Sequence, residues 1–154
     1  WITVAGAPLN VGSDLTELYV GVATQVVQKT FHITGVYGNG VADILATEGN
    51  QYHRWQLGAA RLVSFGATHA TADTGATEPK INVKVDTGLV STNDSNNGIQ
   101  LSGTAGTWVD NPVVNIDTTN YEVSRGDDLE VRVTVVGTNR DAEDLTVECL
   151  FVLE

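Results

Sequence analysis

The chain has 154 residues, a formal net charge of −11 and one cysteine. That length suffices for a domain with its own core, and a single cysteine excludes an intrachain disulfide. A surface this acidic repels nucleic-acid phosphates and anionic membranes, so we expect neither as a partner.

The N-terminal residues 1–12 are largely apolar and carry little turn signal. We expect them to form an arm that lies on a neighbouring subunit. Together with one tryptophan further along the chain, this arm supplies our candidate partner contacts, which are Trp1, Ile2, Val4, Leu9 and Trp55.

The rest of the chain predicts strands and turns rather than helices, because no window shows sustained helical spacing of apolar residues. Two stretches rich in small and polar residues, 66–79 and 86–97, are predicted to be long loops. The strand-like runs before the C-terminal third are residues 18–37 (with a break near 30), 41–47, 56–65, 81–85, 99–101, 108–116 and 121–123. The pattern predicts one all-β domain over residues 1–154, an antiparallel sandwich or barrel of about eight to ten strands.

The clearest strand signals lie at residues 129–135 and 145–153, where every second side chain is apolar over most of each run. Strict alternation indicates that one face of the strand packs and the other meets water. We expect the two runs to pair as an antiparallel hairpin, with Glu130, Arg132 and Glu148 forming cross-strand ion pairs. The same phase puts Cys149 on the inward side, as a small buried apolar residue rather than a reactive thiolate.

Catalytic and metal-binding patterns are missing from the sequence, so we predict no enzyme activity, no cofactor and no metal site. His32, His53 and His69 do not have the spacing of a zinc site. The cluster His53-Arg54-Trp55 could bind a ligand by stacking and hydrogen bonding, but we favour a strand edge with a packed tryptophan and an exposed arginine. Trp1, Trp55 and Trp108 could form a sugar-binding face, although core or interface packing is the commoner role of tryptophan.

The tripeptide Arg125-Gly126-Asp127 matches a known cell-attachment signal for integrins. It runs directly into the alternating strand at residue 129. Glycine and aspartate favour turns, so we interpret the tripeptide as the turn that begins this strand.

The C-terminal third resembles the closing strands of small β-sandwich proteins on tailed-phage virions. The resemblance rests on the Gly-Asp-x-Leu-x-Val-x-Val run at 126–133, a glycine-containing loop, and the final Leu-Thr-Val and Phe-Val-Leu runs at 145–147 and 151–153. It covers residues 123–153. The family it points to is that of capsid decoration or cement proteins, which implies a jelly-roll-like β-sandwich.

The resemblance implies a structural virion protein that binds the outer capsid surface and stabilises the shell, as a homotrimer on the major capsid protein. An all-β pattern, an acidic second half and the lack of a catalytic motif agree with that class. The alternative is a receptor- or glycan-binding domain of a phage fibre or tail component.

Overall fold

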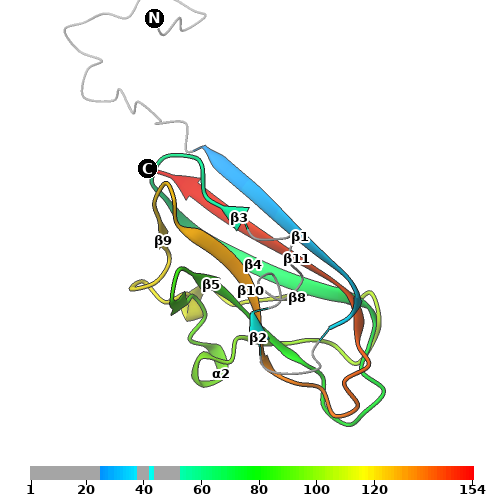
Figure 1. Cartoon of the computed structure of the whole chain (residues 1–154). Helices are drawn as coiled ribbons and strands as arrows, with labels where there is room; N and C mark the ends of the chain where they lie inside the picture. The colour runs from blue at the N-terminus through cyan, green and yellow to red at the C-terminus, as the bar shows by residue number, and fades with distance from the viewer. Residues whose placement is uncertain (1–24, 38–41, 44–52) are drawn as a thin grey trace, which may run out of the picture.

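The computed structural model describes residues 25–37, 42–43 and 53–154, which form two antiparallel sheets that face each other (Figure 1). Sheet A has the order β1 (Val26–Val36), β11 (Glu143–Leu153), β4 (Ala60–Thr71) and β8 (Val109–Asp110), with β9 (Glu122–Val123) also on β4. Sheet B has the order β2 (Ala42–Asp43), β10 (Asp128–Val135), β5 (Lys80–Val85) and β6 (Gly88–Leu89), with β3 (His53–Arg54) on β10 and β7 (Ile99–Gln100) on β5. A short turn α2 (Asn93–Asn96) and a 3-10 turn η1 (Val113–Asn115) complete the elements.

The predicted all-β, antiparallel β-sandwich is confirmed, and its strand order is of the jelly-roll type. Neighbours in each sheet come from distant parts of the chain, as where β11 lies between β1 and β4. Eleven strands are found among the described residues, slightly more than expected, because six of them are only two residues long. No helix of the described residues has the length and apolar character needed to cross a membrane.

The predicted hairpin between the last two long strands is wrong. Both strands exist where the alternation placed them, but β10 pairs with β5 in sheet B and β11 pairs with β1 and β4 in sheet A. Glu130 therefore meets Lys84 of β5, with 2.7 Å between Nζ and Oε2, instead of joining Glu148 across a hairpin. Alternation fixes which face of a strand is buried, but it does not fix which strand lies beside it.

The core fills the space between the two sheets with the inward side chains of both. Val131 of β10 and Val147 of β11 are each fully buried, and the predicted burial of Cys149 is confirmed. Trp55, which directly follows β3, packs on Phe151 of β11 with 4.8 Å between ring centroids. Its indole N–H donates to the carbonyl of Gly58 at 2.7 Å, so the polar end of the ring is also satisfied.

Three other boundary predictions need correction or lie outside the described residues. The loop expected at 66–79 is a strand as far as Thr71, because this stretch pairs with β11 from Gly66 to Thr71. The strand expected at 108–116 shrinks to β8 and a 3-10 turn, since Pro112 has no N–H to donate to a ladder. The N-terminal arm falls outside the described residues.

Two valines of opposite exposure test the position of the core. We expect Val147→Ala to lower the free energy of unfolding by about 2–3 kcal/mol, because the fully buried side chain leaves a cavity. Val114→Ala, at a side chain that is 89% exposed, changes it by less than about 0.5 kcal/mol. Urea denaturation measures both, and equal effects of the two substitutions would contradict this core.

Candidate functional site

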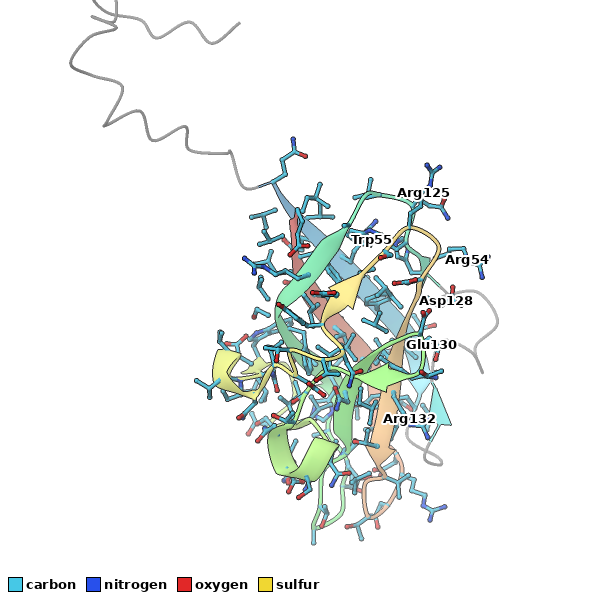
Figure 2. The ribbon with its side chains drawn as sticks, turned by 90° about the vertical axis from the view of Figure 1, so that its left-hand side faces the viewer. Arg54, Trp55, Arg125, Asp128, Glu130 and Arg132 are labelled. Atoms are coloured by element: carbon cyan, nitrogen blue, oxygen red, sulfur yellow. The ribbon has the colours of Figure 1, made fainter. Side chains whose placement is uncertain are left out.

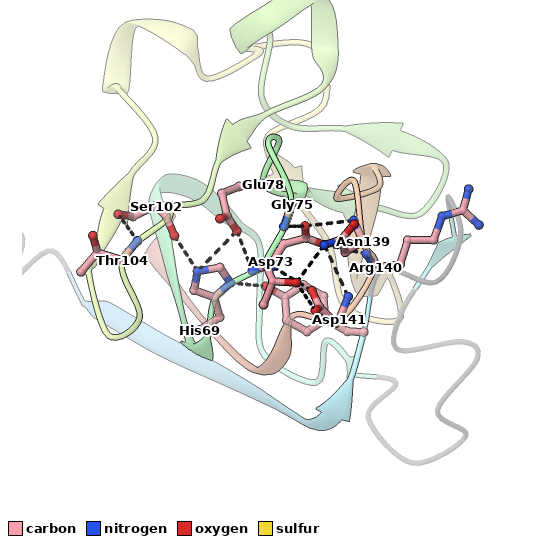
Figure 3. Close-up of polar contacts among 11 residues, drawn as sticks. His69, Asp73, Gly75, Glu78, Ser102, Thr104, Asn139, Arg140 and Asp141 are labelled. Atoms are coloured by element: carbon pink, nitrogen blue, oxygen red, sulfur yellow. Dashed lines mark hydrogen bonds and ion pairs between the residues drawn. The ribbon is translucent and has the colours of Figure 1, made fainter.

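A buried polar cluster lies where the β4–β5 connection meets the β10–β11 connection (Figure 3). At its centre is His69, whose side chain has no exposed surface. The Nε2 atom is 2.7 Å from the carbonyl oxygen of Ser102, and Nδ1 is 2.7 Å from the hydroxyl of Tyr37. A carbonyl only accepts, so Nε2 carries the proton and Nδ1 accepts from Tyr37. Both ring nitrogens of His69 are therefore hydrogen-bonded to other groups of the protein.

Tyr37 keeps its proton for this bond. Burial raises the pKa of its hydroxyl well above the usual range, and the carboxylates of Glu78 and Asp73 raise it further. Glu78 is itself buried and accepts from the backbone N–H of Asp73 at 3.0 Å. The Glu78 carboxylate is thus bonded to the backbone of its own connection.

Asp73 joins the two connections. Its Oδ1 accepts from the N–H groups of Gly75 and Asn139 at 2.7 and 3.0 Å, and its Oδ2 accepts from that of Arg140 at 2.6 Å. Burial alone would raise the pKa of this carboxyl, but the backbone N–H donors outweigh it and hold the pKa below its usual value. The carboxylate acts as a clamp between loops, and the described residues hold no group of three His, Cys, Asp or Glu side chains arranged for a metal ion.

Asp73→Asn tests this clamp. We expect it to lower the free energy of unfolding at pH 7 by about 2–3 kcal/mol, because the amide N–H₂ faces donors where an acceptor is needed. The folded-state pKa lies below the unfolded one, so the stabilisation is present above about pH 4 and is lost as the pH falls through the folded-state value. The difference between the two proteins, followed by urea denaturation, should therefore narrow below pH 4.

The matched control is Glu122→Gln, at an exposed carboxylate of β9. It should change the free energy of unfolding by less than about 0.5 kcal/mol at every pH. A difference between Asp73→Asn and wild type that stayed constant down to pH 2 would contradict the assignment to the ionised carboxylate.

The outer face of sheet B carries ion pairs between neighbouring strands. Figure 2 shows Arg54, Asp128, Glu130 and Arg132 following one another along this face. Arg54 Nε is 3.1 Å from Asp128 Oδ1, and the two residues are directly opposite in the β3–β10 register. Each such pair contributes at most about 1 kcal/mol at an exposed position. The charged side chains of this face are thus largely paired with one another.

The tripeptide at 125–127 is a turn, as predicted. Gly126 has φ +103° and its N–H donates to the carbonyl of Trp55 at 2.8 Å. Asp127 Oδ2 accepts from the N–H of Ser124 at 2.7 Å, which closes the turn before β10. Arg125 is exposed. The Asp127 carboxylate is thus bonded to the backbone of its own turn.

The outer face of sheet A holds a hollow of about 230 Å³ beside an exposed tryptophan. The ring of Trp108, just before β8, lies against Gly66 of β4, where an added Cβ would come within 2.6 Å of ring atoms. Trp108 is 39% exposed, and its Nε1 donates to Asp110 at 2.6 Å. The glycine leaves the space on the sheet in which the ring lies.

Polar side chains from the neighbouring strands border this hollow. Glu148 of β11 is directly opposite Gly66, and Gln28 of β1 and Ser64 of β4 are opposite Leu150. Cys149 also belongs to this stretch, but its side chain points into the core, where burial raises the pKa of the thiol. The hollow therefore combines an aromatic surface with carboxylates, an amide and a hydroxyl.

Gly66→Ala tests the position of the ring. The new methyl overlaps the Trp108 ring, which we expect to swing away from the sheet and become more exposed. Acrylamide quenching of tryptophan fluorescence should rise, while the free energy of unfolding falls by about 1 kcal/mol or less. Gly58→Ala, with nothing within 4 Å of its added Cβ, is the control and should leave quenching unchanged. Unaltered quenching in Gly66→Ala would contradict the close approach.

The sequence-predicted contact residues are only partly placed. Trp55 is fully buried, so it presents no surface to a partner. Its ring packs on Phe151 in the core. Arg54 beside it is exposed, as the strand-edge interpretation expected. The other four candidates, Trp1, Ile2, Val4 and Leu9, lie outside the described residues.

The three histidines lie apart from one another in the structure. His32 is exposed on β1, with Nδ1 3.0 Å from the hydroxyl of Thr146. His53 lies on β3, edge-on to Trp55, and burial and then the charge of Lys29 lower its pKa. Together with buried His69, these positions do not form a common site.

Sequence reasoning missed the exposed apolar segment 108–114. It holds Trp108 and the two most exposed large apolar side chains in the described residues, Val113 at 70% and Val114 at 89%. The signal that could have found it is Pro112, which ends β8 and turns the following valines out of the sheet.

Comparison with known proteins concerns the fold. No protein-family model matches the sequence, and no curated protein matches it. In structure, the chain is similar to a chain in the capsid of Ralstonia phage GP4, with a TM-score of 0.52, 17% identity, and 84% of this chain and 85% of that chain covered. It is also similar to chains in the capsid asymmetric unit of cyanophage Pam1 (TM-score 0.43, 14% identity, 85% of both chains) and in turnip yellow mosaic virus (TM-score 0.28, 14% identity, 84% of this chain and 93% of that one). Of these three, the first has a TM-score high enough to show a shared fold.

Proposed function

We propose that the chain is a structural virion protein that binds the outer capsid surface and stabilises the shell as a cement or decoration protein. The observation that carries this proposal is the shared fold with a phage capsid chain, which extends over 84% of the sequence. The major capsid protein is the proposed partner, and a homotrimer is the proposed state.

The polar clusters of the described residues support a structural role. Both carboxylate oxygens of Asp73 and both ring nitrogens of His69 are bonded within the fold. A catalytic acid or base needs a hydrogen bond to its substrate, and neither group has a free atom to make one. These residues hold loops together.

The exposed segment 108–114 is the proposed capsid contact among the described residues. Val113 and Val114 are exposed in the 3-10 turn η1. Burying them against a partner would remove apolar surface from water, which is favourable. The segment is small, so one copy would bind weakly. A trimer presents three copies at once, and the effective concentration of the second and third contacts strengthens attachment.

The N-terminal arm, residues 1–12, is the second proposed contact. Its apolar residues Trp1, Ile2, Val4 and Leu9 would extend the buried surface by lying on a neighbouring subunit. Deleting residues 1–12 should weaken trimer formation and capsid binding. Unchanged mass in analytical ultracentrifugation and unchanged capsid binding would remove this part of the proposal.

The capsid contact is tested with particles of the parent virus that lack the chain. Purified protein should co-sediment with these particles and raise the temperature at which they release DNA. Val113→Thr/Val114→Thr should lower the affinity at least tenfold, because it replaces methyl groups with hydroxyls at nearly constant shape. The matched control is Val26→Thr/Val36→Thr on β1, two valines that are also exposed.

The readouts separate the parts of this proposal. Loss of binding in the Val113/Val114 variant alone supports segment 108–114 as the contact. Equal loss in both variants contradicts that placement, and absence of binding by the unaltered chain contradicts the cement role.

A further inference from the structure

The hollow on the outer face of sheet A has a fixed aromatic surface. Trp108 lies on Gly66, and the hydrogen bond from its Nε1 to Asp110 at 2.6 Å limits rotation of the ring. A tryptophan exposed to solvent loses apolar burial unless something covers it. The glycine and the aspartate together hold the ring in place before any ligand arrives, which lowers the entropy cost of binding.

Beside this ring, three polar side chains lack partners in the described part of the chain. Gln28, Ser64 and Glu148 line the hollow and make no side-chain hydrogen bond to another described residue. The carboxylate accepts hydrogen bonds only, whereas the amide and the hydroxyl can both donate and accept. On sheet B, by contrast, Lys84 and Glu130 already bond each other. The polar groups of the sheet A hollow therefore remain available to a ligand.

The charge of the hollow selects among ligands. Asp110 and Glu148 line it, and no lysine or arginine of the described residues does. With a chain charge of −11, this surface repels phosphates, sulfates and carboxylates. A purely apolar ligand also fits poorly, because it would cover Glu148 and Gln28 without giving them hydrogen bonds. The matching chemistry is an uncharged molecule with hydroxyl donors and one apolar face.

We propose that this hollow binds one pyranose ring of a neutral saccharide, with the C–H face of the sugar on Trp108 and its hydroxyls on Glu148, Gln28 and Ser64. The volume of about 230 Å³ suits a single ring rather than a drug-sized ligand, whose pockets span about 300–1,000 Å³. A ligand of that size in an open hollow binds with a Kd of about 1–10 mM. Many copies on one particle would raise the avidity for a glycan-coated surface.

The test uses NMR on the full chain with a defined panel of sugars. The neutral probes are the methyl pyranosides of glucose, galactose, mannose, N-acetylglucosamine and rhamnose, and the anionic probes are glucuronic acid and N-acetylneuraminic acid. We expect at least one neutral probe to shift the indole N–H resonance of Trp108, assigned from Trp108→Phe, with saturation at about 1–10 mM. The anionic probes should bind at least tenfold more weakly.

Three variants locate the site. Trp108→Ala should lower affinity at least tenfold, and Glu148→Gln should lower it by a smaller factor while improving binding of the anionic probes. Gly66→Ala should weaken binding although it keeps the indole, since it only displaces the ring. Glu122→Gln, at an exposed carboxylate outside the hollow, is the matched control for Glu148→Gln and should bind as the unaltered chain does. The amide spectra of all variants report whether each one is folded.

Several outcomes would overturn the proposal. It fails if no neutral probe gives a saturable shift at 50 mM, or if folded Trp108→Ala binds as well as wild type. Equal binding of anionic probes would contradict the role of the two carboxylates. Loss of capsid binding in Trp108→Ala without any sugar binding would assign the hollow to a protein contact instead.

Discussion

The packing of the two sheets on each other is the constraint from which the rest of the structure follows. β10 and β11 each carry one apolar face, and neither face can be buried by pairing the strands side by side. Placing them in opposite sheets buries both faces in one core, and Trp55 links the layers by packing on Phe151 with 4.8 Å between ring centroids. Every connection between the sheets must then run over an end of the sandwich, where its backbone groups need partners.

The buried polar cluster provides those partners at one end. The Asp73 carboxylate accepts hydrogen bonds from backbone N–H groups of its own connection and of the β10–β11 connection. His69 of β4 is hydrogen-bonded to Tyr37 and to Ser102. In an isolated view, a buried histidine, a tyrosine and two acids resemble catalytic machinery. The ring nitrogens of His69 and both carboxylate oxygens of Asp73 are bonded within the fold, and these bonds stabilise the loops that the sandwich requires.

The sequence allowed prediction of what local physics decides. Alternation located β10 and β11 and put Cys149 inside, and turn chemistry explained Gly126 before β10. Pairing was not predictable, because the same alternation suits either a hairpin or two strands in opposite sheets. The Trp108–Gly66 contact joins residues far apart in the chain, and Gly66 by itself looked like part of a loop. Asp73 was missed for the same reason, since most of its donors lie on another connection.

The two outer faces differ in a way that bears on function. The outer face of sheet B carries ion pairs between its strands. On sheet A, the Trp108 ring is partly exposed, and Gln28, Ser64 and Glu148 have no side-chain partner among the described residues. Trp108 is also close in sequence to the exposed valines of η1. The apolar surface of segment 108–114 is much smaller than the roughly 1,000 Å² that a stable one-to-one interface buries. In the proposed cement role, a single copy with this surface would leave the capsid readily, so retention would depend on several copies acting together. Under the proposed cement role, oligomerisation and shell binding would therefore be coupled, and a change that separates the subunits would also release them from the shell.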